Sequence, residues 1–332
     1  MATIEQVRSR LDEIIVPHVL RSLTSLNLIR NITVTGNSAR VTLASTALDE
    51  PSQEWLKDKI KEELSGFADI KQTDIEYIEA KPSELNKITR VIAIMSGKGG
   101  VGKSLVTSFT AIALRRKGYE VGILDADITG PSIPKMFGIT NRPHGSESGI
   151  LPVQSAGGIE LISINLFLEN EDEAVIWRGP LIGKAITQFW EDVLWGNLDY
   201  LIVDLPPGTA DAPLTALQVL PVSGAIIVFT PQDLTTMIVK KAVKMARQMD
   251  KNVLGVVENM SYLYVPEIDK KVEIFGKSRG AEMSKAAGAP LLGTLPIDPE
   301  LAVLCDQGKI ERYDAKSFTD FAGLTLKTLA KS

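Results

Sequence analysis

The sequence predicts a doubly wound α/β domain with a mostly parallel sheet, preceded by a small α+β domain. From residue 88 onward, short apolar runs alternate with helical segments, which is typical of strands buried on both faces of a parallel sheet. Before residue 80, apolar residues alternate around a Gly-Asn pair and repeat at helical spacing on either side of it, which predicts a hairpin between two helices. A chain of 332 residues has room for both domains.

The first 80 residues predict the order helix, strand, strand, helix, strand, which is that of a small α+β domain. The expected elements are a helix within 4–16, a hairpin within 32–43 that turns at Gly36-Asn37, a helix from Pro51 that Asp49 or Glu50 caps, and a strand over 70–78. Residues 81–87 contain a proline and three charged side chains. We expect these residues to form a linker.

Beyond this linker, the apolar runs predict six strands, with helices between most of them. The expected strands cover 91–95, 121–124, 201–203, 225–229, 253–257 and 291–295, and two of the expected helices cover 104–116 and 233–249. We therefore expect one domain over residues 1–80 and a second over residues 88–332.

The first of these strands is followed by a glycine-rich loop. Residues 97–104, GKGGVGKS, match G-x-x-x-x-G-K-[ST] between a predicted strand and a predicted helix. Glycines let backbone N–H groups surround a phosphate, and the following helix adds partial positive charge at its N-terminus. Lys103 would reach the β- and γ-phosphates, and Ser104 would ligate Mg²⁺. The second domain is therefore expected to be a P-loop NTPase that binds its nucleotide at Gly97, Lys98, Gly99, Gly100, Val101, Gly102, Lys103 and Ser104.

Aspartates stand at the ends of two further predicted strands. Asp125 ends the second strand of this domain and Asp127 follows it, while Asp204 ends the third strand. In doubly wound sheets, ligands bind at the carboxyl ends of the strands. We therefore expect these three side chains to face the phosphates.

Lys98 distinguishes this loop from the general pattern. The run KGGVGKS at 98–104 resembles the deviant phosphate loop of the MinD, ParA and nitrogenase-reductase group of dimeric ATPases. The resemblance implies that ATP lies between two subunits of a homodimer and that Lys98 reaches the phosphates of the opposite subunit. It also implies that Asp125 lies near Mg²⁺, that Asp127 orients the attacking water, and that Asp204 holds Mg²⁺ through water. The expected catalytic residues are therefore Lys98, Lys103 and Asp127.

Five further segments narrow the resemblance. They are 127–134 (DITGPSIP), 177–180 (WRGP), 204–211 (DLPPGTAD), 229–233 (FTPQD) and 258–262 (ENMSY). Together they resemble the Mrp/ApbC family of ATP-hydrolysing iron–sulfur cluster carriers, and the first 80 residues resemble the PaaD-like domain often fused ahead of it. The resemblance implies an ATP-dependent homodimer that holds clusters and delivers them to client apoproteins, and it implies that Asn259 reads the adenine edge.

The chain departs from this family at the cluster ligands. Carriers of the family have a CxxC pair shortly after the ENMSY segment, whereas residues 263–268 contain no cysteine. Cys305 is the one cysteine of the chain, so a homodimer supplies two thiolates where a [4Fe–4S] cluster held by cysteines needs four. We expect Cys305 to be a buried structural residue, and we expect His18 and His144, which are isolated in sequence, not to be ligands. The cysteine count does not support a cluster, and its ligands stay unassigned.

Composition restricts the other classes of function. The net charge of −5 disfavours nucleic-acid binding, and no apolar run reaches the length of a membrane span. Without a signal-peptide pattern at its start, the chain is expected to be cytoplasmic. The alternative function is a MinD- or ParA-like regulatory switch that binds no cluster. A membrane-binding switch would need a basic amphipathic helix at one end of the chain, but we expect residues 318–329 to form a core helix and no stable membrane association.

Overall fold

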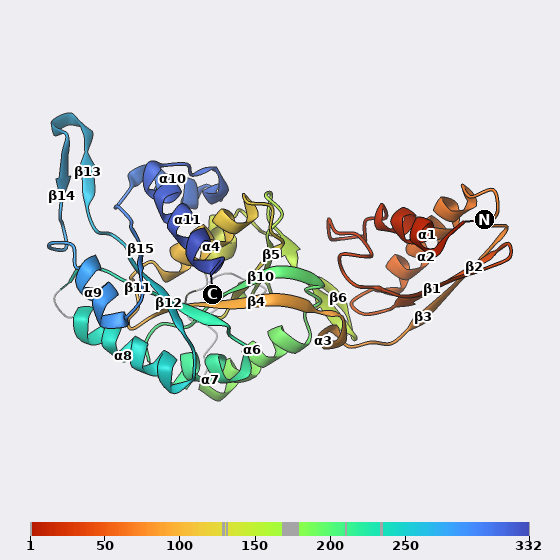
Figure 1. The fold of residues 1–332 in the computed structure, drawn as a ribbon, viewed down its shortest axis with the longest axis horizontal. Coiled ribbons are helices and arrows are strands. Elements are labelled where there is room, and N and C mark those ends of the chain that lie inside the picture. Colours follow the sequence, from red (N-terminus) through yellow and green to blue (C-terminus); the bar gives the residue numbers. More distant parts are fainter. Residues whose placement is uncertain are drawn as a thin grey trace. The chain divides into compact units, whose positions relative to one another are not determined.

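The computed structural model in Figure 1 describes residues 2–127, 130, 132–167, 179–209, 211–232 and 235–331. The chain divides into two compact units. The first comprises Met1–Ile88, Arg142–Gln154 and Gln188–Leu198, and the second comprises Thr89–Asn141, Ser155–Thr187 and Asp199–Ser332. The first unit therefore combines the N-terminal residues with two segments from much later in the chain.

The N-terminal part of the first unit has the expected α+β order. Its elements are α1 (Ile4–Asp12), β1 (Ile29–Thr35), β2 (Ser38–Ala44), α2 (Glu50–Ser65), β3 (Gln72–Ile78) and α3 (Pro82–Leu85). The strands form one sheet in the order β1-β2-β3. β1 pairs with β2 antiparallel around the Gly36-Asn37 turn, and β2 pairs with β3 in parallel. α2 connects the two parallel strands.

Local signals decide where the helices begin and end. Asp49, not Glu50, is the N-cap of α2, and its carboxylate accepts a hydrogen bond from the backbone N–H of Ser52. The first helix ends at Asp12, earlier than its apolar spacing suggested, because the chain turns there and Ile15 is 46% exposed. Residues 81–87, expected as a linker, include α3, and Leu85 is fully buried.

The two later segments complete the first unit. They contain the hairpin of β6 (His144–Ser146) and β7 (Gly149–Leu151), and Leu151 and Leu194 belong to the same apolar core as α1 and α2. Arg21 is 5% exposed. Its guanidinium donates hydrogen bonds to the carbonyls of Trp195 at 2.6 Å and Asn197 at 2.8 Å, and to that of Ser25 at 2.9 Å. One buried cation therefore joins residues about 170 positions apart.

Replacing Arg21 with methionine is expected to lower the free energy of unfolding of the first unit by about 2–4 kcal/mol, because one buried and two partly buried carbonyls lose a charged donor. Urea unfolding followed by intrinsic tryptophan fluorescence, to which the buried Trp195 contributes, measures this loss. Arg40→Met is the matched control, since Arg40 pairs with Asp74 on the exposed surface and such pairs contribute little. Equal urea midpoints for the two variants would contradict the prediction.

The second unit is built around a parallel sheet. The sheet has eight strands in the order β15-β12-β11-β4-β10-β5-β9-β8, and every strand pairing with an assigned register is parallel. The strands of this sheet are β4 (Lys87–Ser96), β5 (Val121–Asp125), β8 (Val153–Gln154), β9 (Glu160–Ser163), β10 (Asn197–Asp204), β11 (Gly224–Phe229), β12 (Val253–Glu258) and β15 (Leu291–Thr294). By the division of the chain, β8 and the first two residues of β4 and β10 are counted with the first unit. The six strands expected from the sequence are thus confirmed.

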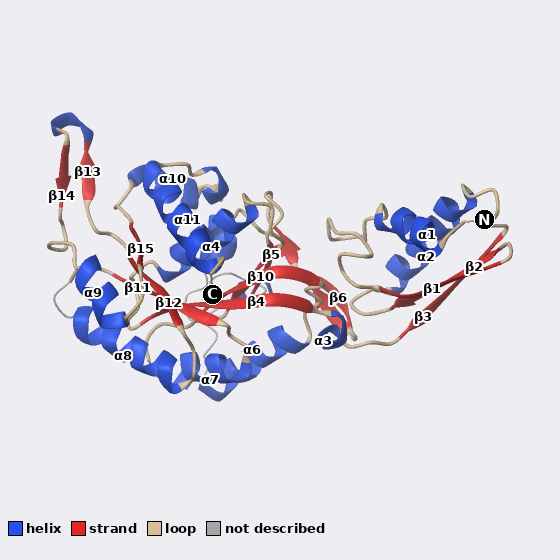
Figure 2. Cartoon of the chain, in the orientation of Figure 1, coloured by secondary structure: helices blue, strands red, loops and turns tan. Residues whose placement is uncertain are grey.

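Helices cover both faces of this sheet (Figure 2). They are α4 (Lys103–Arg115), α5 (Ile133–Met136), α6 (Gly179–Glu191), α7 (Asp211–Val219), α8 (Thr235–Gln248), α9 (Gly280–Ala287), α10 (Pro299–Asp306) and α11 (Lys316–Leu329). A separate hairpin of β13 (Leu263–Val265) and β14 (Lys270–Val272) follows the segment 258–262.

The last helix, α11, packs in the core as expected. Phe318 and Phe321 are buried, and the ring of Phe318 lies 4.9 Å from that of Phe109 on α4. In the part of the chain that the structure describes, no helix combines the length and the apolar character needed to span a membrane. The doubly wound fold with a small N-terminal α+β domain is therefore confirmed.

Candidate functional site

The glycine-rich loop joins the end of β4 to the start of α4. β4 ends at Ser96 and α4 begins at Lys103. Gly102, the N-cap of α4, has φ +79°, a left-handed conformation that favours glycine. A Cβ at Gly102 would lie 2.0 Å from Asn259 Nδ2, and one at Gly97 would lie 2.2 Å from Ile238 Cγ2. The loop therefore brings bare backbone to the N-terminus of a helix, where anions bind favourably.

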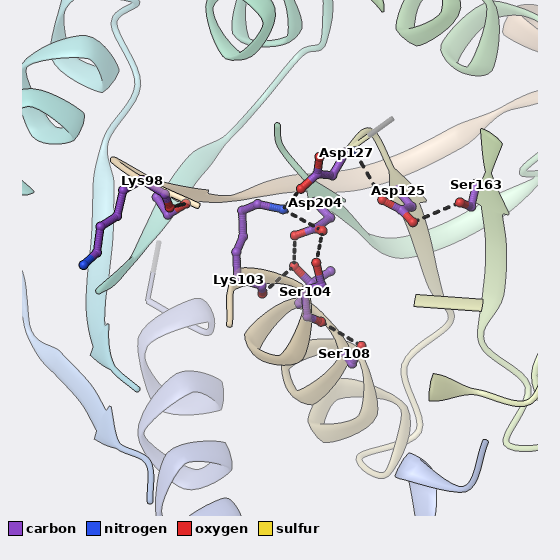
Figure 3. Close-up of polar contacts among 10 residues, drawn as sticks. Lys98, Lys103, Ser104, Ser108, Asp125, Asp127, Ser163 and Asp204 are labelled. Atoms are coloured by element: carbon purple, nitrogen blue, oxygen red, sulfur yellow. Dashed lines mark hydrogen bonds and ion pairs between the residues drawn. The ribbon is translucent and has the colours of Figure 1, made fainter. Parts of the chain in front are cut away.

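Lys103 points from this loop into a group of carboxylates (Figure 3). It is 5% exposed, and its Nζ lies 2.7 Å from Asp204 Oδ2 and 3.3 Å from Asp127 Oδ2. Burial lowers the pKa of Lys103, but the nearby carboxylates, with Asp204 first, outweigh burial and raise it. The ammonium therefore stays protonated where negative charge collects.

Asp204 receives two hydroxyl hydrogen bonds from α4. Ser104 Oγ donates to its Oδ2 at 2.6 Å, and Thr107 Oγ1 donates to its Oδ1 at 2.6 Å. Both oxygens of this fully buried carboxylate are thus held in place. Thr107 is absent from the sequence-based site, although its place one helical turn after Lys103 is a signal that could have identified it.

Asp125 and Asp204 lie level with each other because β5 and β10 pair in parallel at these two positions. Asp125 is fully buried, and Ser163 of β9 donates to its Oδ2 at 2.9 Å. The backbone N–H of Asp127 donates to its Oδ1 at 3.2 Å. Burial raises the pKa of Asp125 above its ordinary value, the charge of Asp204 raises it further, and Lys103 and Ser163 oppose this rise.

This set of donors fits Mg²⁺. Three carboxylates and the Ser104 hydroxyl lie around the single ammonium of Lys103, and hard oxygen donors are the ligands that Mg²⁺ prefers. Among the described residues, no group of three or more His, Cys, Asp and Glu side chains is arranged to hold a metal ion. Mg²⁺ here would therefore need waters and substrate phosphates among its ligands, which is its usual coordination in proteins.

Lys98 does not join this cluster. Figure 3 shows its side chain directed away from Lys103 and the aspartates, and its ammonium donates to Gln232 Oε1. Its backbone carbonyl accepts a hydrogen bond from Ser96 Oγ at 2.9 Å. Its role across a subunit boundary stays a prediction.

Asn259 lies against the phosphate loop. It is 1% exposed, and its Nδ2 donates to the carbonyl of Val101 at 2.9 Å. Its Oδ1 is buried without a hydrogen-bond partner among the described residues. The side chain therefore braces the loop from outside, and its contact with adenine stays a prediction.

The segment after Asp204 also lies beside the loop. The backbone N–H of Gly208 donates to the carbonyl of Ser96 at 3.0 Å, and Pro207 is the nearest neighbour of a Cβ built at Gly99. Seven residues of the recognised segments lie outside the described part of the chain, namely Ile128, Thr129, Pro131, Trp177, Arg178, Ala210 and Asp233.

Cys305 lies on α10 and is half-buried. Burial raises the pKa of its thiol to about 11, with a further contribution from Asp306, so the thiolate that ligates iron is scarce at neutral pH. His18 and His144, far apart in sequence, stack in the first unit with ring centroids 4.1 Å apart. Neither histidine takes part in a metal cluster among the described residues.

Comparison with known proteins identifies the larger domain. The family model described as NUBPL iron-transfer P-loop NTPase matches residues 87–327. The chain belongs to this family. A second model, described as iron–sulfur cluster assembly protein, matches residues 4–77. The expected P-loop NTPase domain and its N-terminal partner domain are therefore confirmed.

Relatives in the family carry matching names. An iron–sulfur cluster carrier protein of Clostridium perfringens is 47% identical over 238 residues, which cover 69% of this chain and 84% of that protein. One of Synechocystis is 38% identical over 344 residues and covers 97% of this chain and 96% of its own. A nucleotide-binding protein of Archaeoglobus fulgidus, solved in complex with ADP, has a TM-score of 0.64 and 42% identity, covering 72% of this chain and 95% of its own.

Proposed function

We propose that this chain binds and hydrolyses ATP with Mg²⁺ and that hydrolysis serves the assembly or transfer of iron–sulfur clusters. The observation that carries the proposal is the convergence of Lys103, Ser104, Asp127 and Asp204 beside a glycine loop at a helix N-terminus. The ADP-bound relative and the names of the cluster-carrier relatives support it. Titration calorimetry with ATP and Mg²⁺, followed by a phosphate-release assay, tests it. Absence of heat and of turnover would refute it.

The roles of the residues follow from their positions. Lys103 would neutralise charge on the terminal phosphates, and Asp127, which pairs with Lys103, would orient the attacking water. Ser104, Asp125 and Asp204 would hold Mg²⁺, which would supply positive charge to the phosphates when bound. The buried hydrogen bonds to Asp204 and Asp125 keep these acceptors in place before the nucleotide arrives.

We place the working site at the boundary of a homodimer, with Lys98 of each subunit directed at the phosphates of the other. The direction of Lys98 away from Lys103 supports this arrangement, because a lysine serving its own phosphate site would turn toward Lys103. A cation supplied in this way would stabilise the transferred phosphoryl group as an arginine finger does.

Lys98→Ala is expected to lower kcat by at least about a hundredfold while leaving the ATP Kd nearly unchanged. Steady-state turnover and calorimetry separate the two quantities. Gln232→Ala is the control, since it releases the Lys98 ammonium without removing it and should retain turnover. Hydrolysis at the wild-type rate in Lys98→Ala would refute the role in trans.

The cluster itself is substrate in this proposal, and the ligands of this chain do not suffice to hold it. One cysteine per chain, half-buried and with a raised pKa, falls short of the four thiolates of a [4Fe–4S] cluster. We therefore propose that a partner or client apoprotein in the cytoplasm supplies the remaining thiolates. The acidic net charge supports protein partners over nucleic acid.

The shortage of thiolates also favours the alternative, a MinD- or ParA-like switch that binds no cluster. Anaerobic reconstitution with iron and sulfide, with and without an added cluster scaffold protein, distinguishes the two. Iron retained by the chain or passed on by it in an ATP-dependent manner would support the carrier function, and a loss of retention in Cys305→Ser would assign a ligand. ATP turnover without any effect on cluster retention or transfer would favour the switch.

A further inference from the structure

A groove lined by basic residues runs between α8 and α9, outside the nucleotide site. One cavity of 690 Å³ is lined by Lys240, Lys241 and Lys244 of α8 and by Arg279 and Glu282 next to them. A second cavity of 320 Å³ continues along the same helix and shares Lys240 and Lys244 with the first. We call these two cavities the basic groove.

The basic groove has positive charge without matching negative charge. Glu282 is the acidic side chain of its lining, and it is already engaged by Arg279 at 2.9 Å and by Thr236 Oγ1 at 2.8 Å. The three lysines are exposed, and no salt bridge within 4.0 Å is recorded for them among the described residues. Lys240 is close enough to Glu282 to contribute to the lowered pKa of that carboxyl, after Thr236 and Arg279. An excess of cations in a groove of a chain with net charge −5 marks a surface suited to an acidic ligand.

The first turn of α8 borders the nucleotide site. Ile238 lies so close to Gly97 that a Cβ on that glycine would be 2.2 Å from its Cγ2 and 2.8 Å from its backbone oxygen. Gln232, which accepts the hydrogen bond of Lys98, lies three residues before α8 begins. A ligand that shifts or rigidifies α8 would therefore act on the phosphate loop and on Lys98 together.

We propose that the basic groove binds an acidic segment of a partner protein and that this docking changes the rate of ATP hydrolysis through α8. The claim that an acidic segment binds is argued from the groove alone, whereas the claim that binding changes the rate of ATP hydrolysis rests on the proposed function. Aspartate and glutamate side chains would pair with Lys240, Lys241 and Lys244. Met237, which is 52% exposed in the lining, offers apolar contact for a neighbouring side chain of the segment.

A protein segment fits the groove better than nucleic acid does. In a polypeptide, the acidic side chains can be placed so that none lies next to Glu282. A nucleic-acid backbone has a negative charge at every phosphate, so some of these charges would lie close to Glu282 and be repelled. The exposed thioether of Met237 also suits an apolar side chain and adds nothing to a phosphate contact. The acidic charge of the whole chain opposes an extended polyanion more than a short segment.

Fluorescence anisotropy with the full-length chain tests the docking. The probe is a fluorescein-labelled synthetic peptide that combines glutamates with leucines, and the reference is the same peptide with glutamine in place of glutamate. We expect the glutamate peptide to bind, the glutamine peptide to bind far more weakly, and added salt to weaken binding. Lys240→Gln combined with Lys244→Gln should weaken binding about tenfold.

Two further variants make the test specific. Lys117→Gln combined with Lys327→Gln changes the net charge equally at exposed positions outside the groove and should leave binding unchanged. Glu282→Gln should strengthen binding, because it removes the acid from the lining. Equal binding by the groove variant and the control variant would overturn the proposal. So would tighter binding of a single-stranded oligonucleotide that depends on the same lysines.

A turnover assay with the bound peptide tests the regulation. We expect the glutamate peptide to change kcat in the wild-type chain and not in the groove variant, whose basal kcat should stay unchanged. Binding without any change in kcat would overturn the regulatory half. Peptide binding to a chain that hydrolyses no ATP at all would instead refute the proposed function and leave the docking intact.

Discussion

Lys103→Ala is expected to lower kcat for ATP hydrolysis by at least about a thousandfold. Its ammonium is the one cation that contacts both Asp204 and Asp127 in the described site, so its loss removes positive charge where the terminal phosphate charge would accumulate. The same change removes the ion pairs of Lys103 with Asp204 and Asp127, and we expect the thermal midpoint of unfolding to fall as well, because the buried Asp204 loses its charged partner. Phosphate release and calorimetry measure activity and stability separately.

The control for this prediction lies at the other end of α4. Lys117 is exposed just after the helix, so Lys117→Ala should retain both turnover and stability. Lys103→Arg provides a second comparison, because it restores the charge but replaces the compact ammonium with a larger, planar guanidinium, and it should recover more of the stability than of the turnover. Turnover in Lys103→Ala within tenfold of wild type would contradict the assigned site.

Gly97→Ala is expected to lower kcat/KM by at least about a hundredfold, because the loop cannot hold its shape once a methyl group meets α8. The new Cβ would lie 2.2 Å from Ile238 Cγ2 and 2.8 Å from the Ile238 carbonyl oxygen. A side chain can rotate away, but the backbone oxygen moves only if the helix moves. Overpacking of this kind also costs about 1–3 kcal/mol of stability, which thermal unfolding would record.

Gly99→Ala is the matched control in the same loop. Its nearest neighbour, Pro207 Cβ, lies 3.9 Å from the added methyl group, which is ordinary contact. This variant should keep most of its ATP affinity and all of its stability. If Gly97→Ala and Gly99→Ala lost the same kcat/KM and the same stability, close packing between the phosphate loop and α8 could not explain the loss.

The parts of the molecule that were predictable are those with local or periodic signals. Six of the eight strands of the sheet appear as apolar runs, and Gly97–Ser104 appears as a spaced motif whose chemistry requires its glycines. Asp125 and Asp204 could be placed at one edge because strand ends meet there in a parallel sheet. Their exact level pairing came from the register of β5 and β10.

The parts that were missed depend on contacts between distant residues. Ser163 holds Asp125 only because the short strand β9 lies next to β5, and four residues are too few for a clear period. Gln232 contacts Lys98 across 134 positions, and the stack of His18 on His144 joins a turn to the start of strand β6. Such pairs follow from tertiary packing, which single-sequence patterns do not encode.

The first unit is built from the N-terminal residues together with two segments from later in the chain. Leu151 and Leu194 are encoded within the larger domain, yet they are covered by side chains from the opening residues of the chain. Truncation of the chain near residue 80 would expose both leucines to solvent. It would also remove Arg21, which donates hydrogen bonds to the carbonyls of Trp195 and Asn197. The N-terminal residues are therefore expected not to be removable without exposing apolar surface on the rest of the chain.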